Sequence, residues 1–369
     1  MKRLLAETSR SLGFAVAQSF TEDILIEILS RLPVKSLVRF KCVSKRWRSL
    51  ISEPHFAKLH LQRLILENIT PSQKIIKSNP LQTIDYEALD NDEVNNHVVV
   101  ESHDLGKDEP WGLAGSCNGL VSLAVDDGFL VYNPTTKESR KLPGSDLVAE
   151  HEFFHGFGYS STTDDYKVVH GAFSKANDGS KECVLEIFSL RSGSWRRVPS
   201  KDVPKLSGPG IYLNGSVHWI VNHGNGSRIE QAIIPFGLAT ETFEEAIPIP
   251  KVEGIVYEGL GIHRGRLFAY DVTWRLCFEA WIMNEYGKGE SWTRLFSVPT
   301  DGLPACQFYT IPIAFTQSKK IVFQIDVSEM ILFNPEDGTY KNYPIEEDDN
   351  VESAIYVETL VSPHVGHEP

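Results

Sequence analysis

Apolar residues recur at helical spacing between residues 20 and 33, which is the strongest helical pattern in the chain. Ser19 or Thr21 can cap the start of this helix with a side-chain oxygen. Pro33 ends it, because the residue before a proline disfavours helical backbone. Since proline is also tolerated at the first position of a helix, we expect a second, short helix after Pro33. Its apolar face would be formed by Val34, Leu37, Val38 and Phe40.

Two further helical segments are expected before residue 66. Ser44 can cap a third helix over 45–51, which Pro54 stops, and the pattern also allows a fourth helix around 56–61. Three short helices enclose a very small core, so a module of this size is only marginally stable alone. Its apolar residues therefore either face inward and against a neighbouring domain or form an exposed patch for a partner.

From about residue 110 onward the pattern is that of β-strands, with apolar runs separated by Gly, Asn, Asp and Pro. Asn-Gly or Arg-Gly pairs at 118–119, 214–215 and 264–265 lie between two such runs and indicate tight hairpins. Five similar units each close with a hydrophobic residue followed by proline, and successive prolines are 56, 51, 49 and 45 residues apart. These prolines are Pro143, Pro199, Pro250, Pro299 and Pro344.

A four-stranded unit of about 45–50 residues has the size of a β-propeller blade. Residues 75–105 and 351–362 can supply a sixth blade by pairing the two ends of the strand-rich region, which would close a ring. We therefore predict an α+β multidomain protein, with a small N-terminal three-helix module followed by an all-β, kelch-like propeller of six blades. Five or seven blades also fit the spacing. A β-sandwich is the competing architecture, but it would not require five similar units.

Composition narrows the classes of partner and compartment. The chain has 36 Lys and Arg against 49 Asp and Glu, a net charge of −13, which argues against nucleic acid or an anionic membrane as the partner. Residues 1–70 carry a net +6 and the remainder −19. No run approaches the roughly 20 apolar residues of a membrane span, and no secretion signal is evident. Five scattered cysteines without a Cys-x-x-Cys pair suit free thiols in a reducing compartment, so we expect a cytoplasmic or nuclear protein.

The helical segment resembles the F-box, the adaptor-binding module of Skp1–cullin–F-box (SCF) ubiquitin ligases. The matching stretches are Phe20-Thr21-Glu22-Asp23-Ile24, Ile28-Leu29, Arg31-Leu32-Pro33, Leu37, Phe40-Lys41-Cys42-Val43-Ser44-Lys45-Arg46-Trp47 and Leu50-Ile51. The family usually opens with Leu-Pro where this chain has Phe20-Thr21, which keeps an apolar anchor but loses the proline. The resemblance implies that a Skp1-like adaptor binds a surface formed by Phe20, Ile24, Pro33, Leu37, Val43 and Trp47.

The strand-rich remainder resembles the F-box-associated, kelch-like domain of plant F-box proteins. Its signature segments are Gly115-Ser116-Cys117-Asn118-Gly119-Leu120, Asn133-Pro134-Thr135-Thr136, Gly156-Phe157-Gly158-Tyr159, Asp164-Asp165-Tyr166-Lys167-Val168-Val169, Tyr212-Leu213-Asn214-Gly215-Ser216-Val217-His218-Trp219 and Tyr356-Val357-Glu358-Thr359-Leu360-Val361-Ser362-Pro363. With the F-box, the resemblance covers roughly residues 20–363. It implies a flexible N-terminus (1–18), the F-box (19–66), a linker with possible first strands (67–109), the propeller (110–363) and a tail (364–369).

The resemblance implies a substrate-recognition subunit of an SCF E3 ubiquitin ligase. The F-box would dock on a Skp1-like adaptor, and through it on a cullin, while the propeller holds the protein to be ubiquitylated. No catalytic residue, metal or cofactor is implied. The candidate recognition loops are 124–128, 174–182, 222–229 and 272–275, because loops on a rigid scaffold commonly carry recognition. Their acidic surroundings favour a neutral or basic target.

Two other functions stay open from the residues alone, a ligase-independent interaction protein and an enzyme built on a propeller. The segment His151-Glu152-Phe153-Phe154-His155 spells the His-Glu-x-x-His pattern of zinc proteases. That chemistry needs both imidazoles on one helical face and a third ligand. Gly156 and Gly158 follow at once within a strand pattern, so we interpret the segment as the start of a blade.

Overall fold

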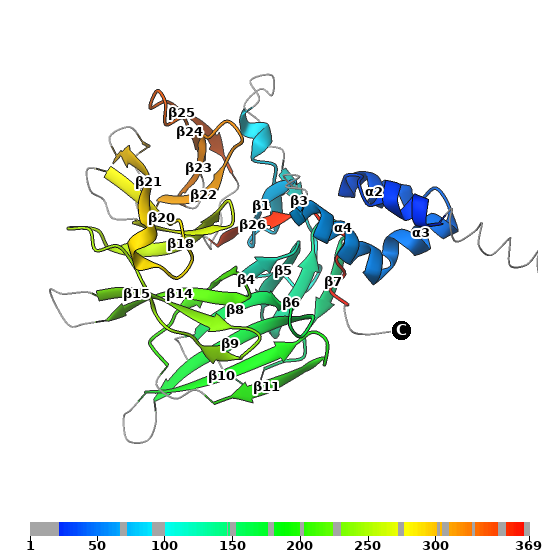
Figure 1. Cartoon of the computed structure of the whole chain (residues 1–369), viewed down its shortest axis with the longest axis horizontal. Coiled ribbons are helices and arrows are strands. Elements are labelled where there is room, and N and C mark those ends of the chain that lie inside the picture. Colours follow the sequence, from blue (N-terminus) through cyan, green and yellow to red (C-terminus); the bar gives the residue numbers. More distant parts are fainter. Residues whose placement is uncertain are drawn as a thin grey trace, which may run out of the picture.

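The computed structural model describes residues 22–66, 72–90, 100–145, 147, 153–175, 181–199, 203–223, 230–271, 277–300, 303–304, 310–326, 329–345 and 352–364. Within these residues a helical module (residues 22–66) lies against one side of a ring of β-sheets (Figure 1). The fold therefore has the two-part organisation predicted from the change in hydrophobic pattern.

The helical module contains four helices. Residues 22–29 form the first, followed by α2 (Val34–Phe40), α3 (Lys45–Ser52) and α4 (Pro54–Leu66). The three predicted helices are confirmed, and the fourth begins at Pro54 because proline fits the first turn of a helix. Ser44 caps α3 as predicted, since its Oγ accepts the Trp47 N–H at 3.1 Å. In the part of the chain that the structure describes, no helix combines the length and apolar content needed to cross a membrane.

Six sheets, named blades A to F, form the ring. Blade A contains β26 (Ser353–Val357), β1 (Gln73–Lys77), β2 (Gln82–Ile84) and β3 (Val100–Ser102). Blade B contains β4 (Gly112–Cys117), β5 (Leu120–Val125), β6 (Gly128–Asn133) and β7 (Glu138–Lys141). Blade C contains β8 (Phe153–Ser160), β9 (Asp165–Lys175), β10 (Lys181–Ser189) and β11 (Ser194–Val198), and β12 (Gly208–Pro209) runs parallel to β8.

The remaining blades follow the same antiparallel plan. Blade D contains β13 (Ile211–Leu213), β14 (Ser216–His223) and β15 (Glu230–Gly237), and β15 also pairs with β16 (Thr242–Phe243) and β17 (Ile247–Pro248). Blade E contains β18 (Tyr257–His263), β19 (Arg266–Asp271), β20 (Cys277–Met283) and β21 (Trp292–Pro299). Blade F contains β22 (Thr310–Phe315), β23 (Ile321–Ile325), β24 (Glu329–Phe333) and β25 (Tyr340–Pro344). The predicted six-bladed propeller is confirmed.

Local turn chemistry accounts for the hairpins between the first two strands of blades B, D and E. The residue pairs 118–119, 214–215 and 264–265 all have positive φ, between 50° and 85°. Two successive positive φ angles define the type I′ turn, whose twist matches that of the flanking strands. The hairpins predicted at these three pairs are confirmed.

Among the described residues the core of the ring is divided into six apolar clusters, and each lies between two neighbouring blades. Both faces of each blade are therefore buried, which explains why many of the strands are apolar along most of their length. One pair of buried residues from each interface shows the order, from A–B round to F–A: Ile76 with Val121, Val131 with Phe157, Val169 with Val217, Ile233 with Ala269, Phe278 with Phe323, and Val322 with Ile75.

The ring is closed by the pairing of the two ends of the strand-rich region. Strand β26 runs antiparallel to β1, with the register Gln73↔Val357 through Lys77↔Ser353. The C-terminal strand thereby becomes the innermost strand of blade A, and it contacts the innermost strands of blades B and F. The predicted pairing of residues 75–105 with 351–362 is confirmed.

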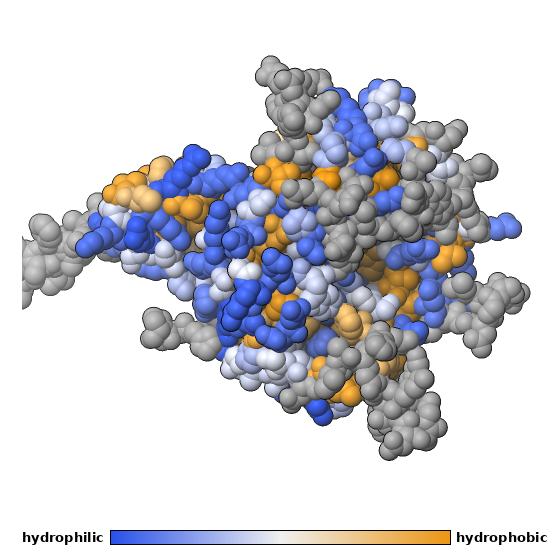
Figure 2. Space-filling model, turned by 180° about the vertical axis from the view of Figure 1, so that it is seen from behind, coloured by the Kyte–Doolittle hydropathy of each residue, from blue (hydrophilic) through white to orange (hydrophobic). Residues whose placement is uncertain are grey.

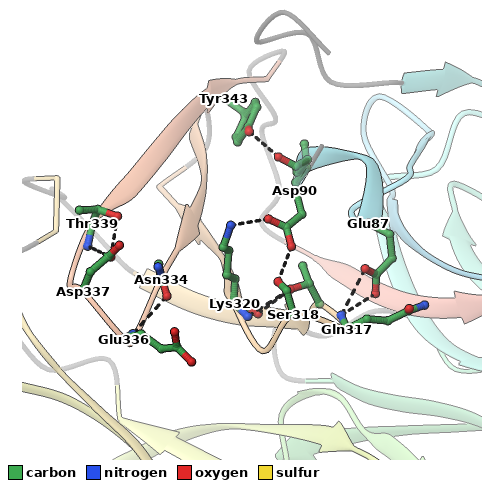
Figure 3. Close-up of polar contacts among 12 residues, drawn as sticks. Glu87, Asp90, Gln317, Ser318, Lys320, Asn334, Glu336, Asp337, Thr339 and Tyr343 are labelled. Carbon is green, nitrogen blue, oxygen red and sulfur yellow. Dashed lines mark hydrogen bonds and ion pairs between the residues drawn. The ribbon is translucent and has the colours of Figure 1, made fainter. Parts of the chain in front are cut away.

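A short 3₁₀ helix, η1 (Glu87–Asp90), adds a second connection between blades A and F (Figure 3). The Glu87 carboxylate accepts the Gln317 N–H at 3.1 and 3.2 Å, and Asp90 contacts Lys320. The Tyr343 hydroxyl donates to the Leu89 carbonyl at 2.6 Å. The sequence predicted a linker with possible first strands over residues 67–109, and within it the side chains of Glu87 and Asp90 meet donors of blade F.

Two buried histidines lead us to predict that the ring loses stability in mild acid. Burial lowers the pKa of His155 and of His218 to about 4, against about 6.5 in an unfolded chain. Folding therefore favours their neutral forms. The two histidines make their full contribution to the free energy of unfolding above pH 6.5, and this contribution is lost as the pH falls toward 4. At pH 5 the loss is about 2 kcal/mol for each histidine. The measurement is the free energy of urea unfolding as a function of pH.

The matched variants are His155→Gln, which should flatten this dependence, and His55→Gln, which should not, because His55 is exposed. An unfolding free energy that stays constant between pH 7 and pH 5 in the unsubstituted protein would contradict the prediction.

Candidate protein-interaction surfaces

The helical module exposes large apolar side chains on the side turned away from the ring. Ile24, Ile28 and Val43 are 46%, 55% and 62% exposed, and we call these three residues the apolar patch. Ile24 and Ile28 lie one helical turn apart and so share a face of the first helix. Glu22 and Arg46, at 3.6 Å, join the start of that helix to α3, just after Val43. Figure 2 shows apolar surface at this outer end of the module.

The residues predicted to bind an adaptor fall into different environments. Ile24, Pro33 and Val43 are exposed, whereas Trp47 is half-buried and its ring meets that of Phe40 edge to face, with centroids 5.4 Å apart. Phe20 lies outside the described residues. The sequence did not single out Ile28 as a binding residue, although its position four residues after Ile24 on the same helical face is a signal that could have found it.

Leu37 does not lie on the surface. It is fully buried in the core of the helical module, in a cluster with Leu29, Ile51 and Phe56. The amphipathic pattern of α2 places Leu37 on an apolar face, but that pattern alone does not say whether the face meets the module's own core or a partner. The expected place of Leu37 in a binding surface therefore needs correction: it supports the surface from within.

Charges of both signs lie beside the apolar patch, since Asp23 and Glu27, which flank its two isoleucines on the first helix, are exposed. Lys45, Arg46 and Arg48 on α3 are exposed, and Arg48 donates to the Lys41 carbonyl at 3.3 Å. An apolar centre with a polar, charged rim is the usual composition of a protein-binding surface.

The opposite side of the helical module attaches to the ring through α4. The Lys58 Nζ lies 2.8 Å from a carboxylate oxygen of Asp164, in the turn between β8 and β9. Lys58, together with the Tyr159 hydroxyl, holds the pKa of Asp164 below its usual value. Leu61 packs against the apolar cluster between blades B and C. The module therefore sits on the side of the ring formed by turns between first and second strands (Figure 1).

The strand ends that flank the candidate recognition loops lie on the other side of the ring. In an antiparallel blade the turn after the second strand is at the opposite end from the turn before it. Strand β9, for example, begins beside Asp164 and spans 11 residues, about 36 Å at 3.3 Å per residue. Loops 124–128, 174–182, 222–229 and 272–275 all follow second strands. We call this side the far face, although most of these loop residues lie outside the described part.

An exposed tryptophan marks the far face on blade B. Trp111 directly precedes β4 and is 39% exposed. Its backbone N–H donates to the Ala124 carbonyl at 3.0 Å, next to the β5–β6 turn. Asp126 and Asp127 of that turn are exposed, and Lys141 Nζ lies 3.1 Å from Asp127. Among the large exposed apolar side chains of the described residues, the others lie on the helical module or toward its side of the ring.

The described part of the zinc-protease pattern, residues 153–155, lies on a strand and not on a helix. His155 lies on strand β8, where its Nε2 is 3.3 Å from the Leu113 carbonyl oxygen, and His151 is outside the described residues. Over the described ranges, no group of three or more His, Cys, Asp or Glu side chains is arranged to hold a metal ion.

Comparisons with known proteins agree with both parts of the fold. Residues 18–59 match the F-box domain, and residues 91–363 match the F-box associated beta propeller domain. An F-box/kelch-repeat protein of Arabidopsis thaliana is 32% identical, over 93% of this chain and 95% of its own length. The F-box protein CPR1 of the same plant is 28% identical, over 85% of this chain and 81% of its own.

Solved structures resemble the ring only loosely. TolB from Acinetobacter baumannii is 9% identical, with a TM-score of 0.42, over 82% of this chain and 72% of that one. A likeness of this size adds nothing to the family matches.

The effects of substitutions on the unfolding free energy should distinguish surface residues of the helical module from core residues. Changing both Ile28 and Val43 to Ser should alter the unfolding free energy by less than about 0.5 kcal/mol for each site, because exposed side chains contribute little packing. Leu37→Ala should cost about 2–5 kcal/mol, because it leaves a cavity. Urea unfolding of the full chain measures both, and equal losses for the surface pair and for Leu37→Ala would contradict the assignment.

Proposed function

Because the chain belongs to the plant F-box proteins that carry an F-box associated β-propeller domain, we propose that it is the substrate-recognition subunit of an SCF E3 ubiquitin ligase. The observation that carries the proposal is the apolar patch at the outer end of the helical module. A patch formed by Ile24, Ile28 and Val43 has the chemistry of a docking site for a Skp1-like adaptor. That adaptor would connect the chain to a cullin.

In this proposal the chain performs no chemistry of its own. The propeller holds a target protein while the adaptor and cullin bring a ubiquitin-charged enzyme to the same assembly. Holding two reactants together raises their effective concentration and so accelerates transfer. The non-catalytic role needs no metal or cofactor, and the cytoplasm or nucleus would supply its partners.

We further propose that the target binds the far face of the ring. The helical module occupies the turns on the other side, so an adaptor-bound chain keeps the far face accessible. Trp111 supplies an apolar anchor there, and Asp126 and Asp127 supply negative charge. This composition favours a target segment that is neutral or basic.

Adaptor binding tests the first part of the proposal. Changing both Ile28 and Val43 to Glu should weaken binding of a purified Skp1-like adaptor about 100-fold, because two apolar contacts are replaced by charges. Isothermal titration calorimetry on the full chain measures the affinity. The matched control is Ile65→Glu, since Ile65 is equally exposed on α4 but lies outside the patch. Failure of the unsubstituted chain to bind the adaptor would favour a ligase-independent interaction protein.

Target capture tests the second part. Proteins that accumulate on the chain when the proteasome is inhibited, and that carry ubiquitin, should be depleted at least about 10-fold by Trp111→Ala. Quantitative mass spectrometry compares this variant with Tyr340→Ala, which removes an exposed aromatic ring on the side of the helical module. Depletion by Tyr340→Ala but not by Trp111→Ala would place the target on the module's side of the ring and contradict this proposal.

A further inference from the structure

The residues that follow the ring-closing strand also form part of the helical module. We call Glu358–Val361 the C-terminal segment; it leaves β26 on the module's side of the ring (Figure 1). Leu360 is 5% exposed and belongs to the buried cluster that also contains Leu29, Leu37 and Phe56. One side chain of the module's core therefore comes from the far end of the chain.

A buried carboxylate connects the same segment to both the helical module and the ring. The Glu358 side chain is 6% exposed, and its Oε1 lies 3.5 Å from the Nζ of Lys35 on α2 and 3.1 Å from the Nζ of Lys74 on β1. The backbone N–H of Glu358 donates to the Ser72 carbonyl at 3.0 Å. Since a buried charge is costly when it loses its partners, this arrangement favours one position of α2 relative to β1.

The other residues of the segment are fixed to the ring. The Thr359 hydroxyl donates to the Asn118 carbonyl at 2.9 Å. The buried side-chain amide of Asn133 donates to the carbonyls of Thr359 and Val361 at 3.1 and 2.7 Å. The fit is close at Gly119, where an added Cβ would lie 2.2 Å from Thr359 Oγ1. The segment thus has little freedom to move relative to blade B.

We infer that Glu358 and Leu360 are positioning residues that hold the helical module in a single orientation on the ring. Leu360 completes the small core of the module, and Glu358 fixes α2 to β1. The orientation depends on ring closure, because these residues directly continue the strand that closes it. The importance of this for ubiquitin transfer rests on the proposed function: a fixed module would keep adaptor and target at a constant separation.

The experiment measures the distance between the module and the ring. One spin label is attached at Cys42, which is exposed on the module, and the other at Ser192→Cys, which is exposed on blade C. The other four cysteines are changed to alanine. Double electron–electron resonance on the full chain should give one narrow distance distribution. Leu360→Ala and Glu358→Gln should each broaden it at least about two-fold, whereas the controls Leu332→Ala and Glu230→Gln should not.

The controls match the chemistry of the test variants. Leu332 is a buried leucine between blades F and A, and Glu230 is an exposed glutamate paired with Lys251. Narrow, unchanged distributions in both Leu360→Ala and Glu358→Gln would overturn the inference. Should Leu360→Ala fail to fold, Glu358→Gln alone decides, because it conserves the volume of the side chain.

A second readout follows the core of the module directly. Leu360→Ala should speed hydrogen exchange of the amides in α2 and α3 about 100-fold or more, as expected when a buried leucine is removed. Leu332→Ala should speed exchange in its own blade and leave those helices unchanged. Neither measurement contains an adaptor. A chain that passes both tests but binds no Skp1-like adaptor would refute the proposed function and leave the positioning role intact.

Discussion

Strand β26 brings the last blade-forming residues against the first strand of the ring, and this contact closes the circle of six blades. The paired residues Ile75 and Ile355 are 280 residues apart, so bringing them together costs roughly 5 kcal/mol of loop entropy on a logarithmic scale. The cost is offset in two interfaces at once, because Ile355 of β26 packs against the cluster shared with blade F and Tyr356 lies in the cluster shared with blade B. Without that pairing, blades B and F would each expose one apolar face.

The same contact organises the two surfaces on which the proposed function depends. The helical module sits where the closing strand emerges, so its attachment uses one side of the ring and leaves the far face accessible. The apolar patch points away from this attachment and remains available to a partner. The two proposed surfaces are thus separated by the thickness of the propeller.

Local signals predicted much of this architecture, because they depend on neighbours in sequence. Ser44 as a helix cap, the Asn118-Gly119 turn and the blade-sized repeat all fall in this class. Leu37 was misplaced because an apolar helical face looks the same whether it meets a core or a partner. The contacts of Leu360 could not be predicted, since no sequence pattern connects residue 360 to a helix more than 300 residues earlier.

The position of Leu360 has a consequence for the order of events during synthesis. The helical module is translated before the ring, yet one side chain of its core is translated only after the strands of all six blades. Domains generally fold as they emerge, from the N-terminal end, but this module meets its full set of core contacts only after all six blades have been made. An unfinished chain therefore carries an incomplete module, and the capacity to engage an adaptor would arise together with the finished ring.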